Sequence, residues 1–553
     1  MSGRESKNNF IMQAGILAAA GIISRIIGLL YRGPLHSVIG DLGMGYYQSA
    51  YNFYTIVLLV SSYSIPAAIS KVIAQKLGVK EYRNAHRIFL CAMLYVLVVG
   101  GVASLFLFFG AGLFVEGEAA IPVLRTFAPT IFVYGILGVL RGYFQAHKSM
   151  SQTSVSQILE QVVNAAVSVG AAYLLINSVM GNMEVPADTA GQVKRATYGA
   201  VGSAIGTGAG VLIALVFMAG IYALNQKMIH RRIRHDRHTK VDSYGDILRM
   251  ITGVVTPFIL STAVYNLSTV VNNKVYTSVY PNLKNLDSVD IYSKWGIFSG
   301  QAMTISNIPL AFASAMAAAM LPTVAQLVAA QDEEGAREKI ALAVKTTMII
   351  AIPCAVGLCV LAEPVTSLLF SNSPEKLALA GKLLMALSPS VVFYALSTLN
   401  SQILQGLGKL NRPIINASIA LVLQSVSAVG LLFFTDMDLY SIAIANTLYS
   451  GMMCLLNQRA VREAVGYRQE VKKTFVVPLL ASLFMGAAAW AVYEGMYLVT
   501  ESMRISVIPA ILVAVGVYFV MLILMRGVTE KELRGFPKGY LIVKVAKKLH
   551  LLR

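Results

Sequence analysis

The chain has 553 residues, of which 56% are hydrophobic and only 13% charged, and its mean hydropathy is +0.66. This composition excludes a soluble globular protein and is typical of a chain that crosses a membrane many times. The formal net charge is +18, which in a soluble protein would point to a nucleic-acid partner.

The apolar segments predict fourteen membrane-spanning helices, since each needs about 20 apolar residues. The first segment follows Arg4 and Lys7 but is too long for a signal peptide, whose apolar region has about 7–15 residues, so we interpret it as a retained helix. The predicted spans are 10–31, 46–70, 88–112, 121–140, 152–177, 198–224, 248–274, 295–320, 341–362, 378–400, 413–434, 439–457, 474–497 and 505–525.

The basic residues lie mainly on one side of this predicted membrane. That side carries 34 of the 45 Lys and Arg residues, including the cluster from His230 to Lys240. Because positive loops face the cytoplasm, both termini are predicted to be cytoplasmic, and no nucleic-acid partner is needed to explain the charge. Apolar residues and lysines alternate at helical spacing in the tail, residues 526–553, which predicts an amphipathic helix on anionic membrane lipids.

The two halves of the sequence resemble each other. The segment Ala128 to Gln145 aligns with Ser388 to Gln405, with prolines, tyrosines and glutamines matching at one offset. We therefore predict an all-α integral membrane protein with two pseudo-twofold-related six-helix lobes, a substrate site between them near the membrane midplane, and two further C-terminal helices. The predicted parts are an N-terminal lobe (1–224), a basic cytoplasmic linker (225–247), a C-terminal lobe (248–457), two helices (458–525) and the tail (526–553).

The first predicted helix carries Arg25 deep in its apolar run and Arg32 seven residues later, on the same helical face. An arginine at this depth is unfavourable unless it faces water or a partner. Two interpretations stay open: a cationic site for an anionic group, or a structural ion pair, for which Glu160 is the candidate. Arg32 can equally extend to the membrane interface.

Polar side chains recur at helical spacing in several other spans, in both predicted lobes. Each stripe is either interhelical hydrogen bonding, at about 0.6 kcal/mol per bond, or the lining of a hydrated cavity. Fixed charges near the stripes are mainly basic, which suits a bulky anionic substrate with sugar hydroxyls, because arginine donates two hydrogen bonds to a phosphate at once. The candidate substrate-binding residues are Arg25, Arg32, Lys274, Lys294, Glu160, Gln157, Asn164, Asn266 and Asn273.

Four segments, SRIIGLLYRGP, YYQSAYNFYTI, IPAAISKVIAQ and RGYFQAHKSMSQTSVSQILEQ, resemble the multidrug/oligosaccharidyl-lipid/polysaccharide exporter superfamily. More closely, they are similar to its SpoVB/YtgP polysaccharide-biosynthesis group, which includes MurJ-like lipid II flippases. The resemblance implies a plasma-membrane flippase that moves an undecaprenyl-pyrophosphate-linked sugar precursor outward by alternating access, without a cofactor. It also implies cell-wall synthesis machinery as partners.

The match to the cationic cavity of that family is partial. Arg25 matches the S-R-x-x-G pattern of the family, and Arg32 lies one residue out of register with its next arginine. Tyr47 and Gln48 replace the family's aspartate in the second span, which also lacks the arginine, and no arginine stands near Met303 in the eighth. Either the cationic site of this chain is formed by Arg25, Arg32 and lysines, or its substrate differs from that of the family.

Three other functions are weighed against lipid II transport. A flippase for another polysaccharide or spore-cortex precursor would use the same chemistry. A cation-coupled multidrug exporter needs buried carboxylates, and only Glu160 is clearly placed in a span. A membrane glycosyltransferase needs clustered carboxylates or histidines at one membrane face, whereas the histidines are scattered and the four cysteines have no metal-ligand spacing; we expect no enzyme.

Overall fold

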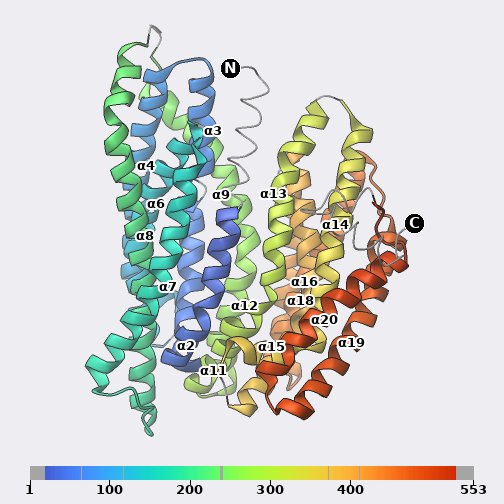
Figure 1. Ribbon diagram of the computed structural model, residues 1–553. Helices are drawn as coiled ribbons and strands as arrows, with labels where there is room; N and C mark the ends of the chain where they lie inside the picture. Colours follow the sequence, from blue (N-terminus) through green and yellow to red (C-terminus); the bar gives the residue numbers. More distant parts are fainter. Residues whose placement is uncertain are drawn as a thin grey trace. The chain divides into compact units, whose positions relative to one another are not determined.

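The computed structural model describes residues 19–530, apart from 64, 116, 148, 237–240, 330, 372 and 410 (Figure 1). The start of the first predicted span and the predicted amphipathic tail helix lie outside the described residues. All regular structure in the described part of the chain is helical. The chain divides into two compact units, unit 1 (Met1–Gly300) and unit 2 (Gln301–Arg553).

Unit 1 begins with a short apolar helix, Ala19–Leu30. Its further helices are α2 (Arg32–Leu58), η1 (Leu59–Tyr63), α3 (Ile65–Gly78), α4 (Tyr82–Phe109), α5 (Ala111–Phe114), α6 (Ile121–Ala146), α7 (Met150–Met180), α8 (Thr189–Arg234), α9 (Tyr244–Lys274), η2 (Val275–Val279), α10 (Tyr280–Lys284), α11 (Ser288–Trp295) and η3 (Gly296–Ala302), which reaches the boundary.

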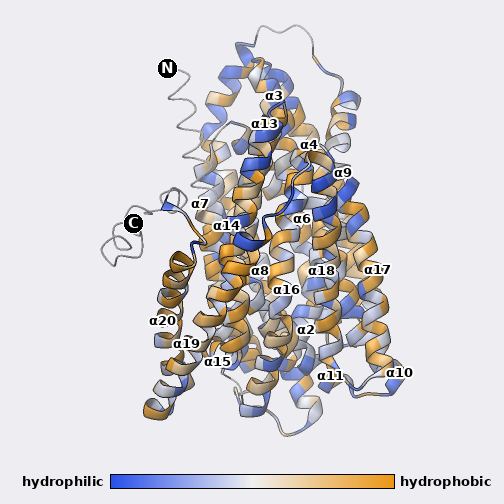
Figure 2. Cartoon of the chain, turned by 90° about the vertical axis from the view of Figure 1, so that its right-hand side faces the viewer, coloured by the Kyte–Doolittle hydropathy of each residue, from blue (hydrophilic) through white to orange (hydrophobic). Residues whose placement is uncertain are grey.

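Unit 2 contains α12 (Met303–Ser306), α13 (Ile308–Ala329), α14 (Glu333–Val360), α15 (Ala362–Leu369), α16 (Pro374–Gly406), α17 (Asn411–Phe434), α18 (Leu439–Val465), η4 (Lys472–Val476), α19 (Val477–Thr500) and α20 (Met503–Leu524). Figure 2 shows how apolar residues run along α19 and α20.

Among the described residues, ten helices are long and apolar enough to cross a membrane: α4, α6, α7, α8, α14, α16, α17, α18, η4 with α19, and α20. The prediction of an all-helical, multi-pass membrane protein is thereby confirmed, whereas the count of fourteen spans stays a prediction.

The predicted loop between the first two spans, residues 32–45, is wrong. The structure has α2 there, interrupted only at Gly40, whose φ of +69° and ψ of −179° are non-helical. Only glycine adopts this conformation without substantial strain. The chain therefore reverses at a single residue, with helical turns on both sides, and needs no loop.

The helix α8 is longer than the predicted span 198–224. It has 46 residues, or about 69 Å at 1.5 Å per residue, roughly twice the thickness of the hydrocarbon core of a bilayer. Ten residues of the predicted linker, up to Arg234, belong to it. They stay helical because Ile229 is buried and Ile233 packs against the same apolar cluster of unit 1.

The helices of each unit pack in a similar order. In unit 1, α6 packs against α3, α4 and α8, and in unit 2, α16 packs against α13, α14 and α18. The sequence repeat aligns α6 with α16. Helix α9 packs against α2, α3 and α4, so it lies in unit 1, although the predicted C-terminal lobe begins at residue 248. The pseudo-twofold relation of two lobes stays a prediction.

Helices α7 and α8 lie at backbone contact because α8 presents small residues to α7. A Cβ atom added to Gly202 would lie 2.4 Å from the amide nitrogen of Ala172, and one added to Gly206 would lie 2.3 Å from that of Ser168. Such contacts are sterically impossible. Small residues at these positions allow the close approach that stabilises helix pairs in membranes.

We expect Gly206→Val to destabilise the protein by about 1–3 kcal/mol or more, because the valine side chain must push α7 away. Thermal unfolding of the purified protein in detergent measures the effect. The matched control is Gly220→Val on the same helix, where no atom lies within 4 Å of an added Cβ. Equal unfolding temperatures for the two variants would contradict the role of Gly206.

Candidate functional site

Arg25 lies on the exposed face of the helix Ala19–Leu30. It makes no hydrogen bond or ion pair within the described part of the chain. Neighbouring positions of the same face carry small residues, and a Cβ added to Gly21 would meet open space there. One turn further on, a Cβ added to Gly28 would lie 3.4 Å from the Oε1 atom of Gln161. The helix Ala19–Leu30 therefore lies along α7, and the guanidinium of Arg25 stays exposed.

Glu160, the candidate ion-pair partner of Arg25, pairs with another arginine. Glu160 accepts a hydrogen bond from Arg141, with 2.7 Å between Arg141 Nη2 and Glu160 Oε2, and Arg141 Nε also donates to Ser156. Only 5% of the Arg141 side chain and 15% of the Glu160 side chain are exposed. The charge of the Glu160 carboxylate is thus neutralised by Arg141 of α6, and Glu160 does not compensate the charge of Arg25.

The sequence interpretation missed Arg141 because the predicted span ended at residue 140 and the arginine was counted as a loop cation. The available signal was the spacing of Glu160 and Ser156, one turn apart on the next helix. A buried arginine needs such acceptors, since an unpaired charge in a low-dielectric interior is strongly unfavourable.

Polar residues of α2 connect this helix to its neighbours. The hydroxyl of Tyr47 lies 3.3 Å from Thr207 Oγ1, which donates to Asn164 Oδ1 at 3.4 Å, and Ser168 donates to the same oxygen at 2.9 Å. The predicted candidate Asn164 therefore belongs to a polar network that reaches α2, and it also holds α7 against α8. The predicted candidate Arg32 is the first residue of α2 itself.

A second group of contacts ties α2 to α9 and η3. Asn273 donates to the backbone oxygen of Ser49 at 3.2 Å and to its hydroxyl at 3.1 Å, and Gln48 donates to the hydroxyl of Ser299 at 3.3 Å. Both amide side chains are buried. These interactions are interhelical hydrogen bonds, one of the two interpretations that the sequence left open for the polar stripes.

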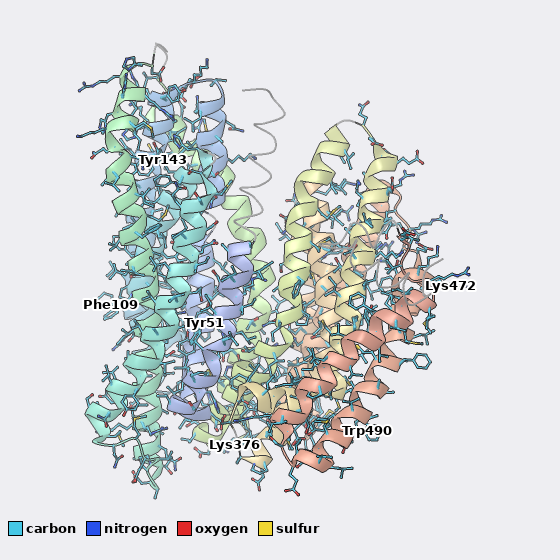
Figure 3. All side chains as sticks on the ribbon, in the orientation of Figure 1. Tyr51, Phe109, Tyr143, Lys376, Lys472 and Trp490 are labelled. Atoms are coloured by element: carbon cyan, nitrogen blue, oxygen red, sulfur yellow. The ribbon has the colours of Figure 1, made fainter. Side chains whose placement is uncertain are left out.

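The remaining candidates lie on α7, α9 and α11. Gln157 is half-buried on α7, and its Oε1 atom is enclosed without a hydrogen-bond donor. Asn266 and Lys274 are half-buried on α9. Lys294 pairs with Asp290 one turn earlier on α11, at 2.9 Å, and is one-third exposed. Figure 3 places Tyr51 among the central turns of the helices of unit 1.

A hydrogen-bonded pair of side chains that the sequence did not predict lies beside the break in α2. His36 Nε2 is 2.7 Å from Asp41 Oδ1, on opposite sides of Gly40, and both residues are buried. Arg195 of α8 donates to the backbone oxygen of Val38 at 2.8 Å. Because the reversal at Gly40 brings residues five apart face to face, helical spacing alone could not identify the pair.

Comparison with known proteins identifies the architecture. The family model described as "Lipid II flippase MurJ" matches residues 82–508. The protein of that name from Bacillus subtilis (strain 168) is 24% identical over 543 residues, covering 93% of this chain and 94% of its own. The Stage V sporulation protein B of the same organism is 22% identical, covering 98% of this chain and all of its own.

Solved structures share the fold at low sequence identity. The structure of a lipid II flippase MurJ in an inward closed conformation superposes with a TM-score of 0.61 at 15% identity, covering 92% of this chain and 98% of that one. An inward-facing multidrug resistance MATE family transporter of the MOP superfamily gives 0.60 at 16%, covering 83% and 98%. This multi-pass membrane protein therefore belongs to the MurJ family of lipid II flippases, whose family model covers most of the chain.

Proposed function

We propose that the chain is a flippase that moves an undecaprenyl-pyrophosphate-linked sugar precursor, the peptidoglycan precursor lipid II, from the inner to the outer leaflet of the plasma membrane by alternating access. The family consists of transporters, and its members named above are flippases or sporulation proteins. The proposed substrate-binding group is the guanidinium of Arg25, together with that of Arg32 at the start of α2.

The observation that carries this proposal is the unpaired charge of Arg25 in an apolar helix. Arg141 is buried and neutralised by Glu160, whereas Arg25 is exposed and has no partner in the described part of the chain. A guanidinium facing lipid tails is unfavourable by several kcal/mol. It is stabilised when its face of the helix lines a water-filled path and meets a pyrophosphate, whose oxygens accept two hydrogen bonds from the arginine fork.

Reconstitution tests the proposal directly. The purified protein is placed in liposomes with fluorescent lipid II, and the fraction that becomes accessible on the opposite leaflet is followed over time against protein-free liposomes. We expect accelerated translocation of lipid II. No acceleration for lipid II would overturn this substrate assignment.

Parallel liposome samples with other substrates distinguish lipid II transport from the two alternative functions. A lipid-linked precursor with another sugar chain, transported in preference to lipid II, would assign the chain to another polysaccharide or to the spore cortex. Efflux of a cationic dye that depends on a proton or sodium gradient would support the multidrug exporter. The fold similarity to MATE transporters motivates this sample, while the basic character of the candidate site argues against a cationic substrate.

A further inference from the structure

A pocket of about 210 Å³ lies where five helices of unit 1 meet, at the end of the unit predicted to face the cytoplasm. It is formed by the end of α3, the start of α4, the end of α6, the start of α7 and the end of α8. Figure 3 shows Tyr143, one of its lining residues, near the end of the unit at which α3 lies, remote from Tyr51. The candidate residues of the transport site do not line it.

The permanently charged group in the described lining of this pocket is a cation, Arg232. Arg232, His86 and His147 line it, and none of the described lining residues is Asp or Glu. Arg232 has no hydrogen bond or ion pair within the described part of the chain. The Nδ1 atom of His86 is enclosed and has no hydrogen-bond partner among the described residues, and the guanidinium of Arg232 retains unused donor capacity.

The N-terminus of α7 adds a further positive contribution. Ser149 and Gln152 line the pocket, and Ser149 is the N-cap residue of this 31-residue helix. Its hydroxyl donates to Gln152 Oε1 and does not cap the first turn. The positive end of the helix dipole and its amide groups favour an anion at this position.

Burial lowers the pKa of His147, and the nearby positive charge of Arg232 lowers it further, against the effect of a hydrogen bond to the backbone oxygen of Tyr143. Apart from Asn225, the remaining walls are aromatic or apolar and include Tyr143 and Phe144. The volume corresponds to about seven water molecules at about 30 Å³ each, which is room for a phosphate group with a small substituent.

We propose that this pocket, bounded by Arg232, His86, His147 and the N-terminus of α7, binds a phosphate group, either the headgroup phosphate of an anionic phospholipid or a soluble phosphate. Arginine and helix N-termini are the groups that bind phosphate most effectively in proteins. Basic pockets between membrane helices on the cytoplasmic side are suited to lipid headgroups. The site is separate from the proposed transport site, so either assignment can fail alone.

Two variants test the proposal in the full-length protein. Gln152→Glu places a negative charge in the pocket but retains the acceptor for Ser149, and a carboxylate in the first turn stabilises the helix. Arg232→Gln removes the exposed cation. The matched control is Arg231→Gln, an exposed arginine on the same turn of α8 that does not line the pocket.

Binding is measured with two probes. Radiolabelled inorganic phosphate is used in equilibrium dialysis, and phosphatidylcholine vesicles with or without phosphatidylglycerol are used for reconstitution, after which retained lipid is quantified by native mass spectrometry. We expect both pocket variants to bind at least about tenfold more weakly than the wild type, as for the loss of a charged hydrogen bond, and Arg231→Gln to bind normally.

The two probes identify the source of the phosphate. Retention of phosphatidylglycerol without binding of inorganic phosphate supports a lipid headgroup, and binding of inorganic phosphate that displaces the lipid supports recognition of the phosphate itself. Equal binding by the wild type, Gln152→Glu and Arg232→Gln, or no binding of either probe by the wild type, would overturn the proposal. Wild-type unfolding temperatures for the variants establish that they are folded.

Discussion

Replacing Arg25 by Ala is expected to abolish outward display of the lipid-linked precursor in a strain depleted of its native flippase. The variant loses the only charged group that the first described helix presents on its exposed face. A charged hydrogen bond to the pyrophosphate contributes about 1.5–3 kcal/mol, so the affinity for the precursor is expected to fall roughly 10- to 150-fold. Surface labelling of the precursor in intact cells measures the effect.

Two controls separate charge from structure in this experiment. Arg25→Lys keeps the charge but loses the two-pronged hydrogen bond, and we expect partial activity. Arg462→Ala removes an exposed arginine at the end of α18 and is expected to be fully active. Full restoration of display by Arg25→Ala at wild-type protein levels would show that this arginine has no role in transport.

The second large effect is expected from Arg141→Met, which leaves the carboxylate of Glu160 without its cation among buried helices. Breaking a buried ion pair from one side destabilises a protein by about 3–5 kcal/mol. We therefore expect a markedly lower unfolding temperature in detergent and reduced yield. The matched control is Arg459→Met: its partner is Glu463, the pair is largely exposed, and loss of such a pair changes stability by about 0–1 kcal/mol.

A double-mutant cycle identifies the cause. Glu160→Gln in the Arg141→Met background removes the uncompensated charge and is expected to recover much of the lost stability, because two neutral groups need no ion partner. If the two substitutions were instead additive, the pair would not be coupled. The double variant also separates folding from transport: a stable but inactive protein would assign the Arg141–Glu160 pair a role in transport besides its role in stability.

The sequence by itself determined the membrane class, the helical architecture and the family. These properties depend on local information: apolar runs of sufficient length specify helices across a bilayer, and short motifs around Arg25 and in the segment from Arg141 to Gln161 carry the family resemblance. Loop charge could likewise be read along the chain, although the orientation derived from it stays a prediction. The predicted positions of the helix ends were less accurate. Helix α8, for example, continues beyond its predicted end because further apolar residues pack against unit 1.

Only the tertiary structure decided which polar groups meet. Glu160 pairs with Arg141 rather than Arg25, because the rotation of α6 against α7 sets that contact and helical periodicity does not report it. Gly40 reverses the chain within a continuous helical stretch. The phosphate pocket draws its lining from five segments far apart in sequence. Such sites depend on the relative rotation and depth of packed helices, which arise from close contacts between many side chains and are encoded in no single segment.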